Sequence, residues 1–471
     1  MKTLSRRNLF RAAGGAAAGA ALSGSRTAFG GRAFQAKRSV IVSIAGGLRL
    51  SESLGMAEGA TMPNLFGRVP LVAGRGDADA GDPRIAPGYV APDLVLPAAR
   101  RSPLFAQGAL VSNLRYAEGV PGHLQGAGCL TSGLYNDLDN REDARLAAPT
   151  LFEIHRRQTN ASALDAWYVS NVAGFYRALQ YSGHPEFGKD FAGSWVSPPS
   201  TANAIVPLVT RGTKQIRLDD LPVVRDTPES NRAARKLRAV LDGNTPEYAP
   251  DVLLSRPEDS AALEDYWATI YGDKTYQAFF PDAVGIGTRN ANGGLDATGD
   301  GLTIYHAERI LQAFKPSVMV VSLIDVDVCH DDFNGYLIGQ RLADALVAHL
   351  WDFIQSTEGL KDETALFVLP EHGRQLQFNG QNSDSLGRSG LDHGGGDDGD
   401  RDVWVLALGP DFRPGVHAPT DIEQSGRGSG RYETIDVVAT AAEILGHGDV
   451  MASTLGGLGA RPGLVMERIL R

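Results

Sequence analysis

Cysteine is nearly absent from this chain, which has only Cys129 and Cys329 among its 471 residues. Two cysteines exclude a disulfide framework, and they exclude a zinc site built from cysteine ligands. They leave two alternatives open: a single Cys129–Cys329 bridge in an oxidising compartment, or two packed thiols. The sequence alone does not decide between these alternatives.

The chain also lacks an excess of positive charge and any long hydrophobic run. Its 45 lysine and arginine residues face 55 acidic residues, a net charge of −10, which disfavours bulk binding to nucleic acid or to anionic lipid. No stretch beyond the N-terminus is apolar for long enough to span a bilayer. With 43% hydrophobic and 21% charged residues, the composition is that of a globular protein. We therefore expect a folded chain with no nucleic-acid partner and no membrane span.

The N-terminus carries the pattern of an export signal. Residues 5–11, SRRNLFR, form a twin-arginine motif, and residues 12–22 form a weakly apolar run rich in alanine and glycine. That run is too short and too rich in small residues to anchor the chain stably in a bilayer. The pattern predicts a removable signal over residues 1–30, recognised by the twin-arginine export machinery. We expect a periplasmic or otherwise exported protein.

Continuous hydrophobic runs without alternation indicate strands that are buried on both faces of a sheet. These runs lie at residues 39–45, 317–324, 364–369 and 403–408. Helical patterns alternate with them at residues 302–314, 337–357 and 433–445. Strands that alternate with helices predict an α/β fold in which helices flank a mostly parallel central sheet.

The segments between these patterns set the expected domain limits. Residues 174–297 have weaker patterns, interrupted by proline and glycine, and are interpreted as an insertion or cap. We expect one α/β domain over residues 39–446 that contains this insertion. A C-terminal tail is expected over residues 447–471.

Side chains that bind metals gather near three of the expected strand ends. They are Asp325, Asp327, His330, Glu371, His372 and His393. In parallel sheets, ligands bind beyond the carboxyl ends of the strands. Carboxylates and imidazoles in this arrangement predict a site for zinc or a similar divalent ion. The alternative is a set of helix caps and polar surface loops.

The order and spacing of these residues resemble the alkaline-phosphatase superfamily, which includes nucleotide pyrophosphatases, sulfatases and cofactor-independent phosphoglycerate mutases. The resemblance covers residues 39–151 and 302–446. Further segments that carry it are Gly46-Gly47-Leu48-Arg49, Met62-Pro63-Asn64-Leu65, Gly122-His123, Ala407-Leu408-Gly409-Pro410 and residues 434–440. It implies an alkaline-phosphatase-like sheet.

The resemblance also implies how the metal ligands divide into two sets. Asp327 or Asp325, with His330 and His393, would hold one ion. Glu371 and His372 match the ligand pair of a second ion, with glutamate in place of the usual aspartate. One or two divalent ions, with zinc as the first choice, are therefore expected.

Two positions depart from the superfamily pattern. Gly46 stands where the superfamily has an aspartate that binds the second ion, and residues 117–123 contain no hydroxyl or thiol to serve as the nucleophile. Such nucleophiles are activated by a metal at neutral pH. Without one, a water molecule would have to attack the ester directly.

The resemblance implies a metal-dependent hydrolase of phosphate or sulfate esters, with a small anionic ester as substrate. Arg49 or Arg374 would neutralise the oxyanion of that substrate. The alternative is a non-catalytic, metal-stabilised binding or assembly protein of the cell envelope. Gly46 and the missing nucleophile favour this alternative, whereas the retained acids and histidines favour catalysis.

Overall fold

The computed structural model describes most of the segments on which these expectations rest, and the helices and strands described below lie within Gln35–Arg471. The described residues are 33–53, 104–139, 143–170, 175–196, 259, 261–263, 266, 299–330, 333–376, 391–422 and 430–471. The expected signal at residues 1–30 and the segment Met62-Pro63-Asn64-Leu65 lie outside these residues, as does most of the expected insertion.

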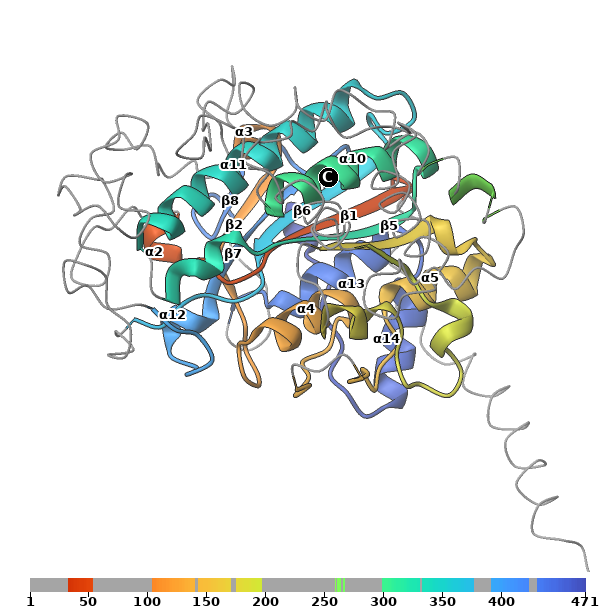
Figure 1. The fold of residues 1–471 in the computed structure, drawn as a ribbon, viewed down its shortest axis with the longest axis horizontal. Coiled ribbons are helices and arrows are strands. Elements are labelled where there is room, and N and C mark those ends of the chain that lie inside the picture. The colour runs from red at the N-terminus through yellow and green to blue at the C-terminus, as the bar shows by residue number, and fades with distance from the viewer. Residues whose placement is uncertain are drawn as a thin grey trace, which may run out of the picture. The chain divides into compact units, whose positions relative to one another are not determined.

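A mixed, mostly parallel sheet forms the centre of the fold (Figure 1). In spatial order its strands are β4 (Ser194–Val196), β3 (Ala166–Ser170), β5 (Val318–Leu323), β1 (Arg38–Ile44), β6 (Thr364–Pro370), β7 (Asp402–Leu408), β2 (Ala109–Arg115) and β8 (Val416–Ala418). The four strands expected from the sequence are β1, β5, β6 and β7, and all belong to this one sheet. The predicted α/β fold class is therefore confirmed.

Strand β7 runs against its neighbours, because it pairs antiparallel with both β6 and β2. β1 pairs in parallel with β5 and β6. The residues that precede β7 therefore lie at the same sheet edge as those that follow β5 and β6. This direction places three separate chain segments at one edge.

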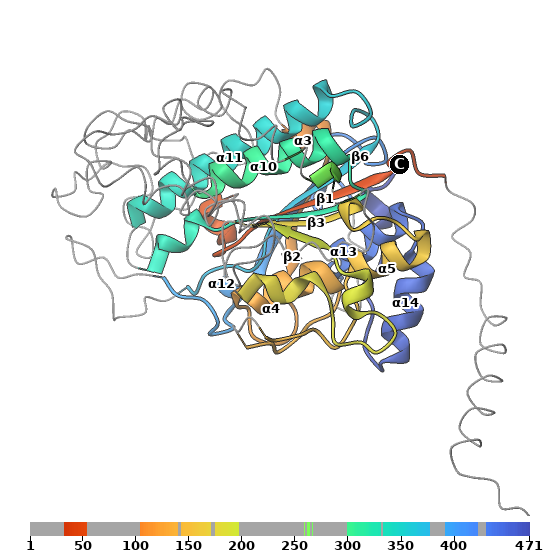
Figure 2. The same ribbon diagram turned by 45° about the vertical axis from the view of Figure 1, so that its right-hand side comes forward.

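Helices cover both faces of the sheet (Figures 1 and 2). One face carries α10 (Gly299–Phe314) and α11 (Phe333–Ser356). The other carries α4 (His123–Ser132), α5 (Leu151–Thr159), α13 (Thr434–Ile444) and α14 (Gly448–Gly457). Short helices are α2 (Leu50–Ser53), α3 (Leu104–Gln107) and α12 (Asp398–Arg401). The helices predicted from the sequence correspond to α10, α11 and α13.

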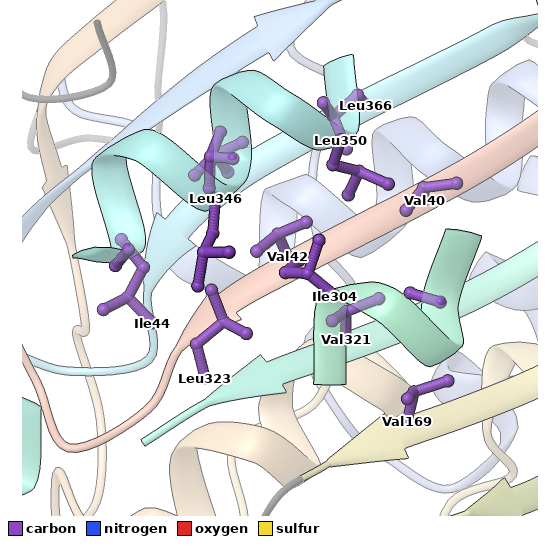
Figure 3. Close-up of a cluster of buried hydrophobic side chains, with 14 of the residues drawn as sticks. Val40, Val42, Ile44, Val169, Ile304, Val321, Leu323, Leu346, Leu350 and Leu366 are labelled. Atoms are coloured by element: carbon purple, nitrogen blue, oxygen red, sulfur yellow. The ribbon is translucent and has the colours of Figure 1, made fainter. Parts of the chain in front are cut away.

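The core between the sheet and the α10–α11 layer explains the continuous hydrophobic runs. Val40 and Val42 project from β1 toward Leu346 and Leu350 of α11, and Ile304 of α10 packs beside them (Figure 3). Alternate residues of a strand point to opposite faces, so β1 must be apolar or small throughout to serve two helix layers. Fully burying each such aliphatic side chain stabilises the fold by roughly 1.5–3 kcal/mol.

On the opposite face, α4 approaches the sheet closely because it contains glycine. A Cβ atom on Gly126 would lie 2.9 Å from the carbonyl oxygen of Glu371, just beyond β6. Only glycine permits this approach without displacing one of the two segments. It brings the first turn of α4, which begins at His123, to the end of β6.

Two segments outside the expected sheet region contribute to the same fold. β4 lies within residues 174–297, interpreted from the sequence as an insertion or cap, and pairs in parallel with β3. In the expected tail, α14 is helical and Leu470 forms a β-bridge with Phe412. None of the helices in the described part of the chain combines the length and the apolar character needed to cross a membrane.

The two cysteines are packed separately. Both are buried and form no disulfide, and the Cys129 thiol lies 3.4 Å from the Thr434 hydroxyl. Of the two alternatives left open by the sequence, the structure shows the packed thiols. Burial raises the pKa of Cys129 to about 12, so this thiol is not a reactive thiolate at neutral pH.

A buried histidine pair joins α5 to the start of α14. His155 Nδ1 lies 2.9 Å from His447 Nε2, and His155 Nε2 lies 2.7 Å from the Asp165 carboxylate. The carboxylate accepts the Nε2–H of His155, so a neutral Nδ1 can accept the Nε2–H of His447. Burial, with the neighbouring His155 as a second cause, lowers the pKa of His447 to about 4.

We expect this pair to make the stability of the protein depend on pH. The folded pKa of His447 lies below the unfolded value of about 6.5, so protonation favours the unfolded chain. The contribution is complete above about pH 6.5 and is lost as the pH falls toward about 4, by on the order of 1–2 kcal/mol. Urea denaturation at pH 7.5 and 4.5 should show a smaller difference for His447→Gln than for the unmodified protein. The partly exposed His184, replaced by Gln, is the control; equal differences in all three proteins would contradict the prediction.

Candidate metal centre

Three segments meet at the edge of the sheet where β5 and β6 end. A 3₁₀ turn at Asp325–His330 follows β5, and Glu371 and His372 follow β6 directly. The third segment contains Asp392 and precedes β7; Gln375 donates its backbone N–H to the Asp392 carbonyl at 2.8 Å. Carboxylate and imidazole side chains that are far apart in the sequence thus lie at the same edge of the sheet.

Asp327 is the centre of a first group of side chains. Its Oδ1 lies 3.2 Å from His330 Nε2 and 3.7 Å from His393 Nε2, and its Oδ2 lies 3.4 Å from His123 Nε2. Arg374 donates to Oδ1 at 2.5 Å. Burial would raise the pKa of Asp327, but the imidazoles and Arg374 hold it well below its usual range. The four carboxylate and imidazole ligand atoms lie within 4.8 Å of one another.

Glu371 is the centre of a second, more deeply buried group. It accepts hydrogen bonds from the backbone N–H of Gly46 at 3.0 Å and from the Tyr176 hydroxyl at 2.9 Å. His123 Nδ1 lies 2.8 Å and His372 Nε2 lies 3.3 Å from its Oε1. Burial would raise the pKa of Glu371, but the contacts with His123 and His372 lower it to about 2. Glu371 is therefore an ionised carboxylate inside the protein.

Two imidazole nitrogens fit a metal ion. His372 Nε2 and His393 Nε2 are buried, and neither has a partner in hydrogen-bonding geometry among the described residues. His372 Nδ1 lies 2.8 Å from the Gly373 carbonyl, which must accept a proton there, so Nε2 keeps its lone pair. Burial lowers the pKa of His372, and lowers that of His393 to about 3. Neutral imidazoles beside ionised carboxylates are the donor set that zinc and similar divalent ions take.

His123 joins both groups, although the sequence pattern singled it out only as part of Gly122-His123. It is the first residue of α4 and lies between the carboxylates of Asp327 and Glu371. Burial alone would lower the pKa of His123, but the two carboxylates outweigh this effect and raise it to about 9. Tyr176 is the other residue that the sequence reasoning missed, because it falls in the stretch interpreted as an insertion. No sequence signal marks it.

The remaining candidates lie near the cluster but have other contacts. Asp325 accepts the backbone N–H of Asp300 at 3.0 Å, and belongs to neither ligand group; of the two alternatives, Asp327 is the one that the structure places with His330. Arg374 is fully buried and directs its charge at Asp327. Arg49 is also buried, and its Nη1 donates to the Gln375 carbonyl at 3.1 Å.

Asp392 orients one of the expected ligands. Its Oδ1 lies 2.5 Å from His330 Nδ1, so it accepts that N–H and leaves Nε2 directed at Asp327. Loss of a carboxylate that orients a metal-bound histidine weakens metal binding about 10–100-fold. We expect this loss for Asp392→Ala in a chelator competition titration. Asp398→Ala is the matched control, because Asp398 pairs with Arg115 on the surface; equal metal affinities of the two variants would contradict the assigned role.

The hydroxyls and the thiol of α4 do not supply the missing nucleophile. Thr131 and Ser132 donate their hydroxyls to backbone carbonyls of the preceding helical turn, with Ser132 Oγ 2.8 Å from the Gly128 oxygen. Cys129 is packed against Thr434. All three lie in the last turns of the helix, whereas His123 lies at its start. Gly46 has a φ of +88° and supplies its backbone N–H to Glu371 in place of a side chain.

Comparison with known proteins gives structural matches only. No protein-family model matches the chain, and no curated protein sequence matches it. It is similar in structure to alkaline phosphatase PafA, with a TM-score of 0.45 and 9% identity over 94% of this chain and 100% of that one. A phosphonate monoester hydrolase from Silicibacter pomeroyi gives a TM-score of 0.35 and 11% identity over 87% and 72%.

A protein of the alkaline phosphatase superfamily from Vibrio parahaemolyticus gives a TM-score of 0.38 and 10% identity over 88% of this chain and 67% of that one. At these TM-scores and identities, the likeness carries no argument about a reaction, which has to come from the side chains of the site. Solved structures of the alkaline-phosphatase superfamily are among those that this chain resembles.

Proposed function

We propose that this protein is an exported, metal-dependent hydrolase of phosphate or sulfate esters. One observation carries the proposal: Asp327, His330, His393 and His123 converge within 4.8 Å, and His393 offers a buried nitrogen with no hydrogen-bond partner among the described residues. Zinc is the ion that this donor set fits best. Export rests on the twin-arginine motif at residues 5–11.

The side chains of the chain have separable roles in this proposal. Asp327, His330 and His393 would hold the ion, and Asp392 fixes the ring of His330. Arg374 neutralises part of the charge on Asp327 from inside the protein. A bound divalent ion would act as a Lewis acid, which polarises the ester and stabilises the negative charge of the transition state.

The attacking group is expected to be water, because residues 117–123 provide no hydroxyl or thiol. A single displacement by water inverts the configuration at a chiral phosphorus atom and leaves no covalent enzyme intermediate. Retention of configuration, or a phosphoryl or sulfuryl adduct found by mass spectrometry, would show that a side chain attacks.

A second function, as a metal-stabilised binding or assembly protein of the cell envelope, is favoured by two specific observations. Gly46 is the residue where the superfamily resemblance implies a metal-binding aspartate, and its backbone N–H donates to Glu371 Oε1 at 3.0 Å. The loop before α4 lacks a nucleophile. In this reading the ion contributes folding free energy and no chemistry.

Metal loading followed by assay separates the two functions. The full chain, loaded with Zn²⁺, should hydrolyse at least one of three generic esters: a phosphate monoester, a phosphate diester or a sulfate ester. His330→Ala and His393→Ala should lose both the metal and the activity, whereas His349→Ala, on α11, should keep both. A fully metallated protein that is inactive on all three ester classes would reject the hydrolase and support the second function.

A further inference from the structure

His123 presents a different ring nitrogen to each of the two ligand groups. Its Nε2 lies 3.4 Å from Asp327 Oδ2, and its Nδ1 lies 2.8 Å from Glu371 Oε1. The ring centre is 4.5 Å from that of His393 and 5.5 Å from that of His372. A histidine in this place could serve either group as a ligand, and the distances decide which.

The two contacts of His123 have different lengths. Two ligand atoms on a tetrahedron, each at the bond length of zinc to nitrogen or oxygen, lie about 3.3–3.5 Å apart. Asp327 Oδ2 lies 3.4 Å from His123 Nε2, and Asp327 Oδ1 lies 3.2 and 3.7 Å from the Nε2 atoms of His330 and His393, all close to this spacing. The 2.8 Å contact between His123 Nδ1 and Glu371 is instead the length of a charge-assisted hydrogen bond.

Glu371 has the surroundings of a hydrogen-bond acceptor. Its side chain is fully buried, and it accepts the N–H of Gly46 and the hydroxyl of Tyr176 in addition to the His123 N–H. A metal-bound histidine usually donates its second ring N–H to such a carboxylate, which fixes the ring and its tautomer. Asp392 stands in the same relation to His330. The cluster thus has two carboxylate–histidine pairs whose second ring nitrogens face Asp327. His372 Nε2 lies 3.3 Å from Glu371 Oε1 and stays outside this set.

We propose that His123 Nε2 is a fourth protein ligand of a single divalent ion also held by Asp327, His330 and His393, and that Glu371 is a positioning residue. This inference rests on the metal site of the proposed function. Structural zinc sites have four protein ligands, whereas catalytic sites have three and keep one position open. An anionic ester can then reach the ion only as a fifth ligand or in the place of His123. A metal spectrum that phosphate leaves unchanged therefore favours the second function, a metal-stabilised binding or assembly protein, over the hydrolase.

The visible spectrum of Co²⁺, a spectroscopic substitute for zinc, tests this arrangement without an activity assay. The full chain should bind one Co²⁺ per molecule, with a spectrum that inorganic phosphate leaves unchanged. Glu371→Gln should keep the stoichiometry of one and bind the ion about 10–100-fold more weakly. His123→Ala should bind it more weakly still, and its spectrum should shift when phosphate enters the vacated position.

His349→Ala is the matched control, because His349 Nδ1 also lies 2.8 Å from a buried glutamate, Glu308, between α10 and α11. It should behave like the unmodified chain. Two ions per chain, a phosphate-dependent spectrum in the unmodified protein, or equal affinities of His123→Ala and His349→Ala would each overturn the proposal. If His123→Ala does not fold, the stoichiometry and the phosphate titration of the unmodified protein still decide. An unmodified chain that binds no Co²⁺ would overturn this inference and the proposed metal site together, whereas bound Co²⁺ with an open position would overturn this inference alone.

Discussion

Replacing Asp327 with alanine is expected to abolish metal binding and to lower the free energy of unfolding by about 3–5 kcal/mol. Asp327 is the carboxylate shared by three histidines and Arg374. Arg374 is fully buried, so the substitution leaves its charge unpaired inside the protein, the situation that makes a broken buried pair costly. Chemical denaturation in the presence of a chelator measures the stability term, and elemental analysis measures the loss of metal.

Asp327→Asn keeps the shape of the side chain and removes only its charge. It therefore shows how much of the loss of metal and of the loss of stability depends on that charge. Glu363→Ala is the control on the surface, since Glu363 also pairs with two basic residues, Lys37 and Arg38. We expect little effect from the control, because exposed ion pairs contribute little. An Asp327→Ala variant that keeps its metal, or that is as stable as the Glu363→Ala variant, would contradict the central position assigned to Asp327.

Substituting Gly46 is expected to have the second large effect, and Gly46→Asp should not restore a second metal ligand. Gly46 has a φ of +88°, and a Cβ there would lie 2.7 Å from Asp327 Cβ and 2.9 Å from its backbone nitrogen. Any side chain must therefore displace the turn that carries Asp327. The left-handed backbone adds about 1–2 kcal/mol, and overpacking adds about 1–3 kcal/mol. Gly46→Ala and Gly46→Asp should both lose about 2–5 kcal/mol of stability and bind metal more weakly.

Gly446→Ala measures the backbone part of this prediction by itself. Gly446 has a similar φ of +76°, but a Cβ at this position would meet nothing within 4 Å. Only the backbone term of about 1–2 kcal/mol is expected there. The difference between the two alanine variants in urea denaturation measures the collision with Asp327. A stable Gly46→Asp protein that binds a second ion would show that the turn can move and that the two-ion site can be rebuilt.

The sequence by itself determined the fold class and the positions of the central strands. β1, β5, β6 and β7 are continuous hydrophobic runs, and such runs are local signals that depend only on burial of both strand faces. The sequence also placed Asp327, His330, Glu371, His372 and His393 near strand ends, because ligands in α/β sheets gather there. These conclusions needed no knowledge of which residues meet in space.

Only the tertiary structure decided how those residues combine. The antiparallel direction of β7 brings the segment of Asp392 to the edge where β5 and β6 end, and no local pattern reports the direction of a buried strand. His123 enters the cluster because Gly126 lets α4 approach the end of β6, and Tyr176 reaches Glu371 from a distant part of the chain. Hydrogen bonds to Glu371 and the charge of Arg374 on Asp327 likewise join residues far apart in the sequence. The role of each acid in the cluster therefore depends on long-range packing. Its position near a strand end, in contrast, could be predicted from the sequence.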